Sequence, residues 1–196
     1  MQAAPNSPSV PSTPDPTQLP IRLLRDCIRR AVADGAGWIQ IREKDLQARA
    51  LVELARFAVA ETRAAGARVF INDRLDVALA ANAGGLHLGE KSLRLARVVE
   101  WRRSTSRQDF WIGVSCHSLE SALAAERGGA DYIFFGPVYA TPSKAAFGAP
   151  QGIGRLRELC AAVSIPVLAI GGVNQKNIQE CIAAGAAGIA AIRMYQ

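Results

Sequence analysis

The chain has 196 residues, which is enough for one sizeable hydrophobic core and short for two, so we expect a single domain. Hydrophobic residues make up 49% of it, and no apolar run approaches the roughly 20 residues of a membrane span, which argues against both disordered and membrane-spanning proteins. The net charge of +6 suits an anionic partner, either nucleic acid or small phosphorylated metabolites.

Two features narrow the partner and the compartment. The basic cluster of Arg102, Arg103 and Arg107 has no interleaved aromatic residues, so we expect no nucleic acid as partner. We also expect no membrane partner, and we leave a homo-oligomer open. The four cysteines form no Cys-x-x-Cys pair and have no histidine at metal-ligand spacing, which argues against zinc. Reduced thiols of this kind are typical of a cytoplasmic protein.

Residues 1–20 differ in composition from the rest of the chain. They hold six of the ten prolines and lack periodic apolar positions, so we expect a disordered tail followed by one domain over 21–196. They also lack the basic start and apolar core of a signal peptide.

From residue 21 onward, a small-residue turn followed by a short apolar strand recurs along the chain. Near-continuous apolar strands that alternate with amphipathic helices predict a parallel sheet covered on its outside. The repetition, and the absence of Gly-x-Gly-x-x-Gly, favour an α/β fold of the (β/α)8 TIM-barrel class over a doubly wound sheet. Seven strands can be assigned, so the barrel is expected to be truncated, with the first strand and the last helix missing. The expected strands are 38–42, 69–72, 86–88, 110–114, 132–135, 165–170 and 188–192.

Barrel active sites form at the carboxyl ends of strands, so polar residues that follow the strands are site candidates. Gln40, Arg42 and Lys44 repeat with period two, and an extended segment would direct all three to one face as a fork for a polyanion such as pyrophosphate. The alternative is an exposed strand end paired with Glu43 and Asp45.

Two further strand ends offer ligands for metal and phosphate. Asn72 and Asp73 supply hard oxygen atoms suited to Mg²⁺, or they form only an N-cap for a helix over 74–81. Gly171 and Gly172 offer backbone N–H groups to a phosphate, or they form a plain tight turn.

Two histidines and one loop complete the candidates. His117 is an acid/base candidate or a helix cap, whereas His87, within an apolar strand, is interpreted as structural. The loop 139–144 carries two hydroxyls and a cation, which together suit an anion.

Seven ordered motifs together resemble the thiamine phosphate synthase and thiazole tautomerase superfamily over about residues 21–196. They are Gln40-x-Arg42-x-Lys44, Ile71-Asn72-Asp73-Arg74, His87-Leu88-Gly89, Gly113-Val114-Ser115-x-His117-Ser118, Phe135-Gly136-Pro137-Val138, Thr141-x-Ser143-Lys144 and Ala169-Ile170-Gly171-Gly172. In the synthase, the resemblance implies, a pyrimidine pyrophosphate ionises to a carbocation, and a thiazole phosphate nitrogen captures it with release of pyrophosphate and with Mg²⁺ as cofactor.

The resemblance also assigns roles to residues. Asp73 would bind Mg²⁺, with Ser92 at the place of a second metal ligand, and Ser115, His117 and Lys144 are the catalytic candidates. The phosphorylated substrates would contact a larger set, namely Gln40, Arg42, Lys44, Asn72, Glu90, Ser115, Thr141, Pro142, Ser143, Lys144, Gly171, Gly172, Ile192 and Arg193.

The sequence departs from the family pattern in three places. A metal-binding Asp is replaced by Ser92, although Glu90 is close enough in sequence to substitute. A Ser near the end of the last strand is replaced by Arg193, and the first strand of the family has no counterpart in residues 1–20.

These departures keep two alternatives to the synthase open: the tautomerase, with His117 moving a proton, and an inactive barrel remnant. Unpaired barrel edges also predict low stability, aggregation or weak activity.

Overall fold

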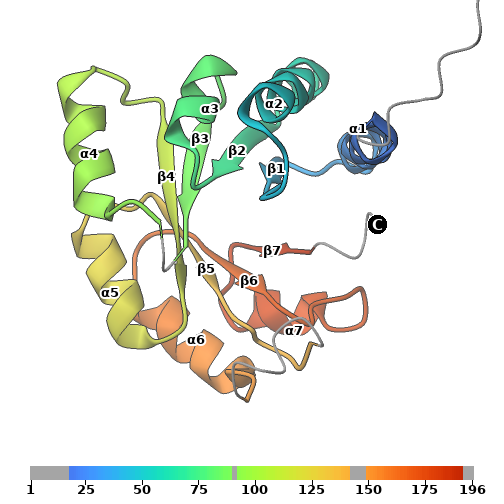
Figure 1. Cartoon of the computed structure of the whole chain (residues 1–196). Helices are drawn as coiled ribbons and strands as arrows, with labels where there is room; N and C mark the ends of the chain where they lie inside the picture. The colour runs from blue at the N-terminus through green and yellow to red at the C-terminus, as the bar shows by residue number, and fades with distance from the viewer. Residues whose placement is uncertain (1–17, 90–91, 142–148, 192–196) are drawn as a thin grey trace, which may run out of the picture.

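The computed structural model describes residues 18–89, 92–141 and 149–191. Within them, short strands alternate with helices along the chain (Figure 1). The strands are β1 (Trp38–Ile41), β2 (Arg68–Asn72), β3 (Gly85–Leu88), β4 (Trp111–Cys116), β5 (Tyr132–Phe135), β6 (Val167–Ile170) and β7 (Gly188–Ala190). The helices are α1 (Gln18–Ala33), α2 (Ala48–Arg63), α3 (Leu75–Ala80), α4 (Leu95–Ser104), α5 (Leu119–Arg127), α6 (Gly152–Ala162) and α7 (Ile178–Ala183).

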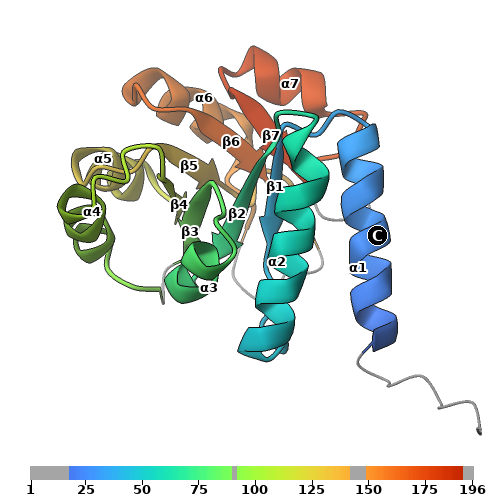
Figure 2. The same ribbon diagram turned by 90° about the horizontal axis from the view of Figure 1, so that it is seen from above.

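The strands form one parallel sheet in which each strand pairs with its neighbours in sequence, from β1 to β7. The sheet curls, with helices along its outer side, and its two edge strands β1 and β7 face the same open side (Figures 1 and 2). The prediction of a barrel-like α/β fold with seven parallel strands is therefore confirmed. Among the described residues β1 and β7 do not pair with each other, as expected for an open barrel.

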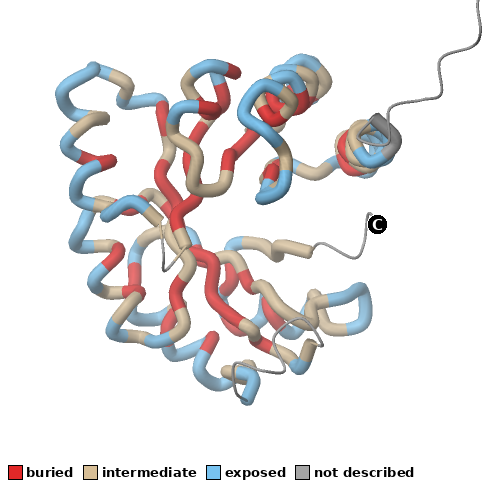
Figure 3. Tube along the Cα trace, in the orientation of Figure 1, coloured by how far each residue is buried: buried red, intermediate tan, exposed pale blue. Residues whose placement is uncertain are grey.

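The outer face of the sheet and the inner faces of the helices make most of the hydrophobic core. Alternate strand residues such as Ile39, Ile71 and Leu86 point outward and are buried against the helices. The expected periodicity of α2 is confirmed, because Leu51 and Leu54 are among its buried residues. Figure 3 shows this division, with burial along the strands and on the sheet-facing sides of the helices.

The opposite strand positions fill the interior of the curl. Aromatic rings of Trp38, Phe70, Trp111 and Tyr132 contact one another there at centroid distances of 4.8–5.5 Å. Gly113 leaves the space that the phenol ring occupies, because a Cβ atom at this position would lie 1.9 Å from that ring. Two residues closer to the carboxyl ends of several strands, the side chains at the interior positions are polar. These positions form the carboxyl-end face of the sheet.

The amino-terminal helix lies beside α2 (Figure 2). Helix α1 begins at Gln18, within the last three residues of the expected tail, while residues 1–17 lie outside the described part. Its Ile28 and Ala31 are buried in the core cluster shared with α2. None of the described helices is long and apolar enough to cross a membrane.

Candidate functional site

A chain of hydrogen bonds links the ends of β1 and β2. Gln40 Nε2 donates to Asn72 Oδ1 at 3.2 Å, and Asn72 Nδ2 donates to Asp73 Oδ2 at 2.7 Å. The amide oxygen of Gln40, Oε1, is buried and has no hydrogen-bond partner among the described residues. Since a buried acceptor without a donor is costly, this atom is suited to accept a hydrogen bond from a ligand.

The carboxylate of Asp73 lies where the metal was expected. Its backbone is in the left-handed region with φ of 62°, an uncommon conformation that occurs often at functional sites. Ser92 Oγ donates to Asp73 Oδ1 and accepts from Gly89 N at 2.6 Å, so the sequence-expected pair of metal positions is adjacent in space. The N-cap alternative is wrong, because the N-cap residue of α3 is Arg74.

The donor set fits Mg²⁺ in its common form, which takes one or two carboxylates and completes its coordination with water and substrate phosphates. Asp73 provides one carboxylate and Ser92 a neutral hydroxyl oxygen. No group of three or more His, Cys, Asp or Glu able to hold a metal occurs in the described parts of the chain. A metal here would therefore depend on substrate oxygens.

The structure corrects the strand bounds behind the expected fork of Gln40, Arg42 and Lys44. Strand β1 ends at Ile41, so both cations lie in the following loop and are exposed, and their common face with Gln40 stays a prediction. The charge of Arg42 nevertheless influences a residue of β3, because it is one of the causes that lower the pKa of His87.

His87 is the residue whose role sequence reasoning missed. Its side chain is buried, and its Nε2 lies 2.8 Å from Ser115 Oγ, so it directly contacts a candidate site residue. Burial, with a smaller effect from Arg42, lowers the pKa of His87 to about 4 against the opposing charge of Asp73, which keeps the ring neutral near pH 7. The available signal in the sequence was its place among the polar residues near the ends of apolar strands, and in the structure His87 is the register partner of Asn72.

His117 does not cap α5, and its side chain is hydrogen bonded to the backbone after β5. Its Nδ1 is hydrogen bonded to the backbone carbonyl of Gly136, and its backbone N–H donates to Ser121 Oγ at 3.3 Å. Ser118 caps α5 instead, since its hydroxyl accepts from Ser121 N at 3.1 Å. The ring is therefore oriented at the end of β4, close to the loop that follows β5.

The turn after β6 contacts the loop after β5 through the backbone. Tyr139 N donates to Gly171 O at 2.9 Å, and Asn177 Nδ2 donates to Gly172 O at 3.1 Å. Both glycines have positive φ, 89° and 70°, and a Cβ atom on Gly172 would lie 2.7 Å from Ala140 O. This turn therefore requires glycine. It packs against Tyr139 and Ala140, the two residues before the half-buried Thr141.

Several expected site residues cannot be placed. They lie outside the described ranges and comprise Glu90, Pro142, Ser143, Lys144, Ile192 and Arg193.

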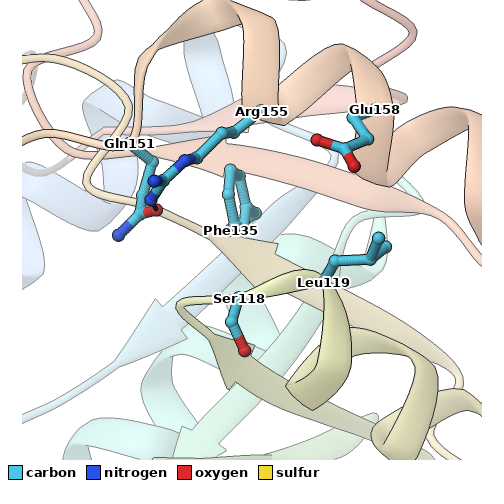
Figure 4. Close-up of a pocket in the computed structure, with 6 residues that line it drawn as sticks. All are labelled: Ser118, Leu119, Phe135, Gln151, Arg155 and Glu158. Carbon is cyan, nitrogen blue, oxygen red and sulfur yellow. Dashed lines mark hydrogen bonds between the residues drawn. The ribbon is translucent and has the colours of Figure 1, made fainter.

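A cavity of about 150 Å³ lies between α5 and α6, beside Phe135 at the end of β5 (Figure 4). Its lining includes the Arg155 side chain, which donates from its guanidinium to Gln151 Oε1 at 2.9 Å. The other lining residues are Ser118, Leu119, Phe135 and Glu158, and none of the six is an expected site residue.

Comparison with known proteins gives a consistent result. A family model described as thiamine monophosphate synthase matches residues 15–195. The chain is 46% identical over 167 residues to the thiamine-phosphate synthase of Moorella thermoacetica, covering 85% of this chain and 78% of that protein. It is 45% identical over 164 residues to the thiamine-phosphate synthase of Methanocella arvoryzae, covering 84% of this chain and 76% of that protein.

The structure is similar to solved structures as well. The thiamine phosphate pyrophosphorylase from Pyrococcus furiosus matches with a TM-score of 0.75 and 35% identity, over 88% of this chain and 78% of that one. FabK from Thermotoga maritima matches with a TM-score of 0.59 at 18% identity, over 84% of this chain and 52% of that one, which concerns the fold alone.

Proposed function

The chain belongs to the thiamine monophosphate synthase family, and we propose that it carries out the family's transfer reaction with its own strand-end residues. In this reaction, 4-amino-2-methyl-5-hydroxymethylpyrimidine pyrophosphate and 4-methyl-5-(2-phosphooxyethyl)thiazole give thiamine phosphate and pyrophosphate. The observation that carries the proposal is the hydrogen-bonded set of Gln40, Asn72 and Asp73 at the expected strand ends.

The proposed roles on the pyrimidine side follow from the chemistry of each group. The unpartnered Oε1 of Gln40 would accept from the amino group of the pyrimidine, while Asn72 holds that amide in place. Arg42, Lys44 and Lys144 would neutralise the pyrophosphate as its bond to the pyrimidine methylene breaks and negative charge develops on the leaving oxygen. The electron pair of the bond leaves with pyrophosphate, and the thiazole nitrogen then forms the new bond to the methylene carbon.

Asp73 and Ser92 would hold Mg²⁺ together with oxygens of the pyrophosphate. The ion would supply additional positive charge to the leaving group. Ser92 brings no charge of its own, so Asp73 is the main protein anchor, and Glu90 is the candidate for a second carboxylate.

On the thiazole side, the proposed phosphate contacts are Thr141 and the turn Gly171–Gly172, extended by Pro142, Ser143, Ile192 and Arg193. The backbone bond from Tyr139 to Gly171 supports this assignment, because it keeps the two loops side by side. Both substrates are phosphorylated metabolites, and we expect the enzyme to act in the cytoplasm.

The test is an assay with both substrates and Mg²⁺, which should yield thiamine phosphate and pyrophosphate. Product that forms from the thiazole alone by isomerisation would support the tautomerase instead. No product of either kind from the folded chain would support the inactive remnant.

His117→Ala separates the two enzymes further. A proton-transfer role would cost on the order of 10²–10⁴-fold in rate, whereas the synthase should retain most of its activity. Ser121→Ala is the matched control, because it alters the same helix start without removing the imidazole.

A further inference from the structure

Three hydrogen-bonding side chains from different strands cross the interior beneath the strand-end face. The hydroxyl of Tyr132 on β5 lies 3.1 Å from His87 Nδ1, and His87 Nε2 lies 2.8 Å from Ser115 Oγ on β4. Tyr132 and His87 are not on neighbouring strands. Gly113 is the register partner of both, and its missing side chain is what allows the phenol to reach across β4 to the imidazole.

The donor of each hydrogen bond can be assigned from the partners that its atoms have. Tyr132 is fully buried, and among the described residues its hydroxyl has no hydrogen-bond partner other than His87. Burial raises the pKa of Tyr132 well above its usual value, so the hydroxyl keeps its proton and donates it to Nδ1. Because Nδ1 accepts this proton, the imidazole carries its own proton on Nε2, from which it donates to Ser115 Oγ.

We propose that Tyr132 and His87 are positioning residues that fix Ser115 as a hydrogen-bond donor toward an anionic oxygen of the bound pyrophosphate group. The proposal rests on the proposed function and on the substrate contact that the resemblance implies for Ser115, which we assign to the pyrophosphate group. Because Ser115 Oγ accepts from His87 through one of its two lone pairs, the hydroxyl directs its proton elsewhere, and the described residues form no other hydrogen bond with it. The opposite tautomer would make Ser115 donate to Nε2 and present only lone pairs, which would repel a phosphate oxygen.

The tautomer can be read directly by long-range ¹H–¹⁵N correlation spectra of the wild-type chain near pH 7. The chain has two histidines, so a His117→Gln variant assigns the signals. We expect His87 to be protonated on Nε2 and unprotonated on Nδ1. Protonation of Nδ1, or of both nitrogens, overturns the proposal.

Two variants test the role of the phenol. Tyr132→Phe removes the hydroxyl but keeps the ring, and we expect it to bring the Nδ1-protonated tautomer into the spectrum. Phe134→Leu is the control, because this ring packs at 4.3 Å from the imidazole without a hydrogen bond. An unchanged tautomer in folded Tyr132→Phe, or an equal change in Phe134→Leu, contradicts the positioning role.

Binding of inorganic pyrophosphate with Mg²⁺, measured by calorimetry, tests the consequence. Ser115→Ala should weaken binding about 10- to 100-fold and Tyr132→Phe about 3- to 10-fold, and the double variant should be no weaker than Ser115→Ala alone. Additive losses would contradict action through Ser115. If Tyr132→Phe does not fold, the His87 tautomer in the wild-type chain and the pyrophosphate affinity of Ser115→Ala test the proposal instead. A chain that shows these results but makes no thiamine phosphate would refute the proposed function and leave this inference standing.

Discussion

The strand-end face is built in two different ways on its two sides. From β1 to β4 the groups offered to a ligand are side chains held by other side chains, as in the bonds joining Gln40, Asn72 and Asp73. Beside β5 and β6 the chain offers mainly backbone, where Tyr139 N bonds to Gly171 O and Asn177 Nδ2 bonds to Gly172 O.

The two sides of the face should therefore be sensitive to different kinds of mutation. On the β1–β4 side, changing a functional group at constant size should alter binding of the pyrophosphate. On the β5–β6 side, adding atoms to the backbone should alter binding of the thiazole phosphate, because its shape depends on close approach and positive φ.

The largest effect is expected from Asp73→Asn, which removes the charge but tolerates the left-handed backbone. Loss of the metal anchor should lower kcat/KM by about 10²-fold or more and raise the Mg²⁺ concentration needed for activity. Asp76→Asn is the control, because Asp76 is exposed and pairs with Arg74 at the surface. Steady-state kinetics over a Mg²⁺ titration measures both, and equal losses would contradict a metal role for Asp73.

The second prediction concerns acid stability, which should depend on the β1–β4 side through His87. Because burial lowers its folded pKa to about 4 from 6.5, the unfolded chain binds more protons between these values. Its contribution is therefore complete above pH 6.5 and lost as the pH falls toward 4, by up to about 3 kcal/mol.

Urea unfolding at pH 7 and pH 4.5 measures this loss. The wild type should lose about 2 kcal/mol more between the two values than His87→Gln, which lacks only the buried imidazole that titrates in this range. Identical losses in the two proteins would show that His87 is not buried in its neutral form.

The third prediction concerns the β5–β6 side. Gly172→Ala places a Cβ atom against the loop after β5, at a residue whose φ is 70°, so the turn must shift. We expect the KM for the thiazole phosphate to rise about 10-fold or more, consistent with about 1–3 kcal/mol of backbone strain. Gly154→Ala in α6 is the control, since a Cβ atom there meets nothing within 4 Å. A comparable rise in the KM for the pyrimidine substrate would show that the two sides are not separable.

Much of the β1–β4 side could be predicted from sequence because short apolar strands and the polar residues after them are local features. Asn72 and Asp73 follow β2 directly, and the structure places them as expected beside Gln40 and Ser92. The expected strand ran one residue too far at Arg42, because a period-two pattern does not specify where strand pairing ends, and β1 ends at Ile41.

The contact of His87 with Tyr132 could not be predicted in the same way. It depends on the register of three strands, which places Gly113 between the two residues, and no local pattern in the sequence specifies that register. The Gly171–Gly172 turn was recognised as a phosphate candidate, but its packing against the loop after β5 is a tertiary contact.

The smallest effect is expected where a side chain supports the backbone-built side. The Tyr139 hydroxyl donates to Glu180 Oε2 at 2.5 Å and so ties the loop after β5 to α7. Burial and this bond raise the pKa of Tyr139, so it remains a donor throughout the neutral range. Tyr139→Phe and Glu180→Gln should each raise the KM for the thiazole phosphate about 3-fold with kcat nearly unchanged, because one hydrogen bond contributes about 1 kcal/mol. Glu158→Gln, which removes an exposed carboxylate on α6, should leave both constants unchanged. If kcat falls instead while KM holds, the tie acts on the reacting groups rather than on the phosphate turn, and the two sides of the face are coupled.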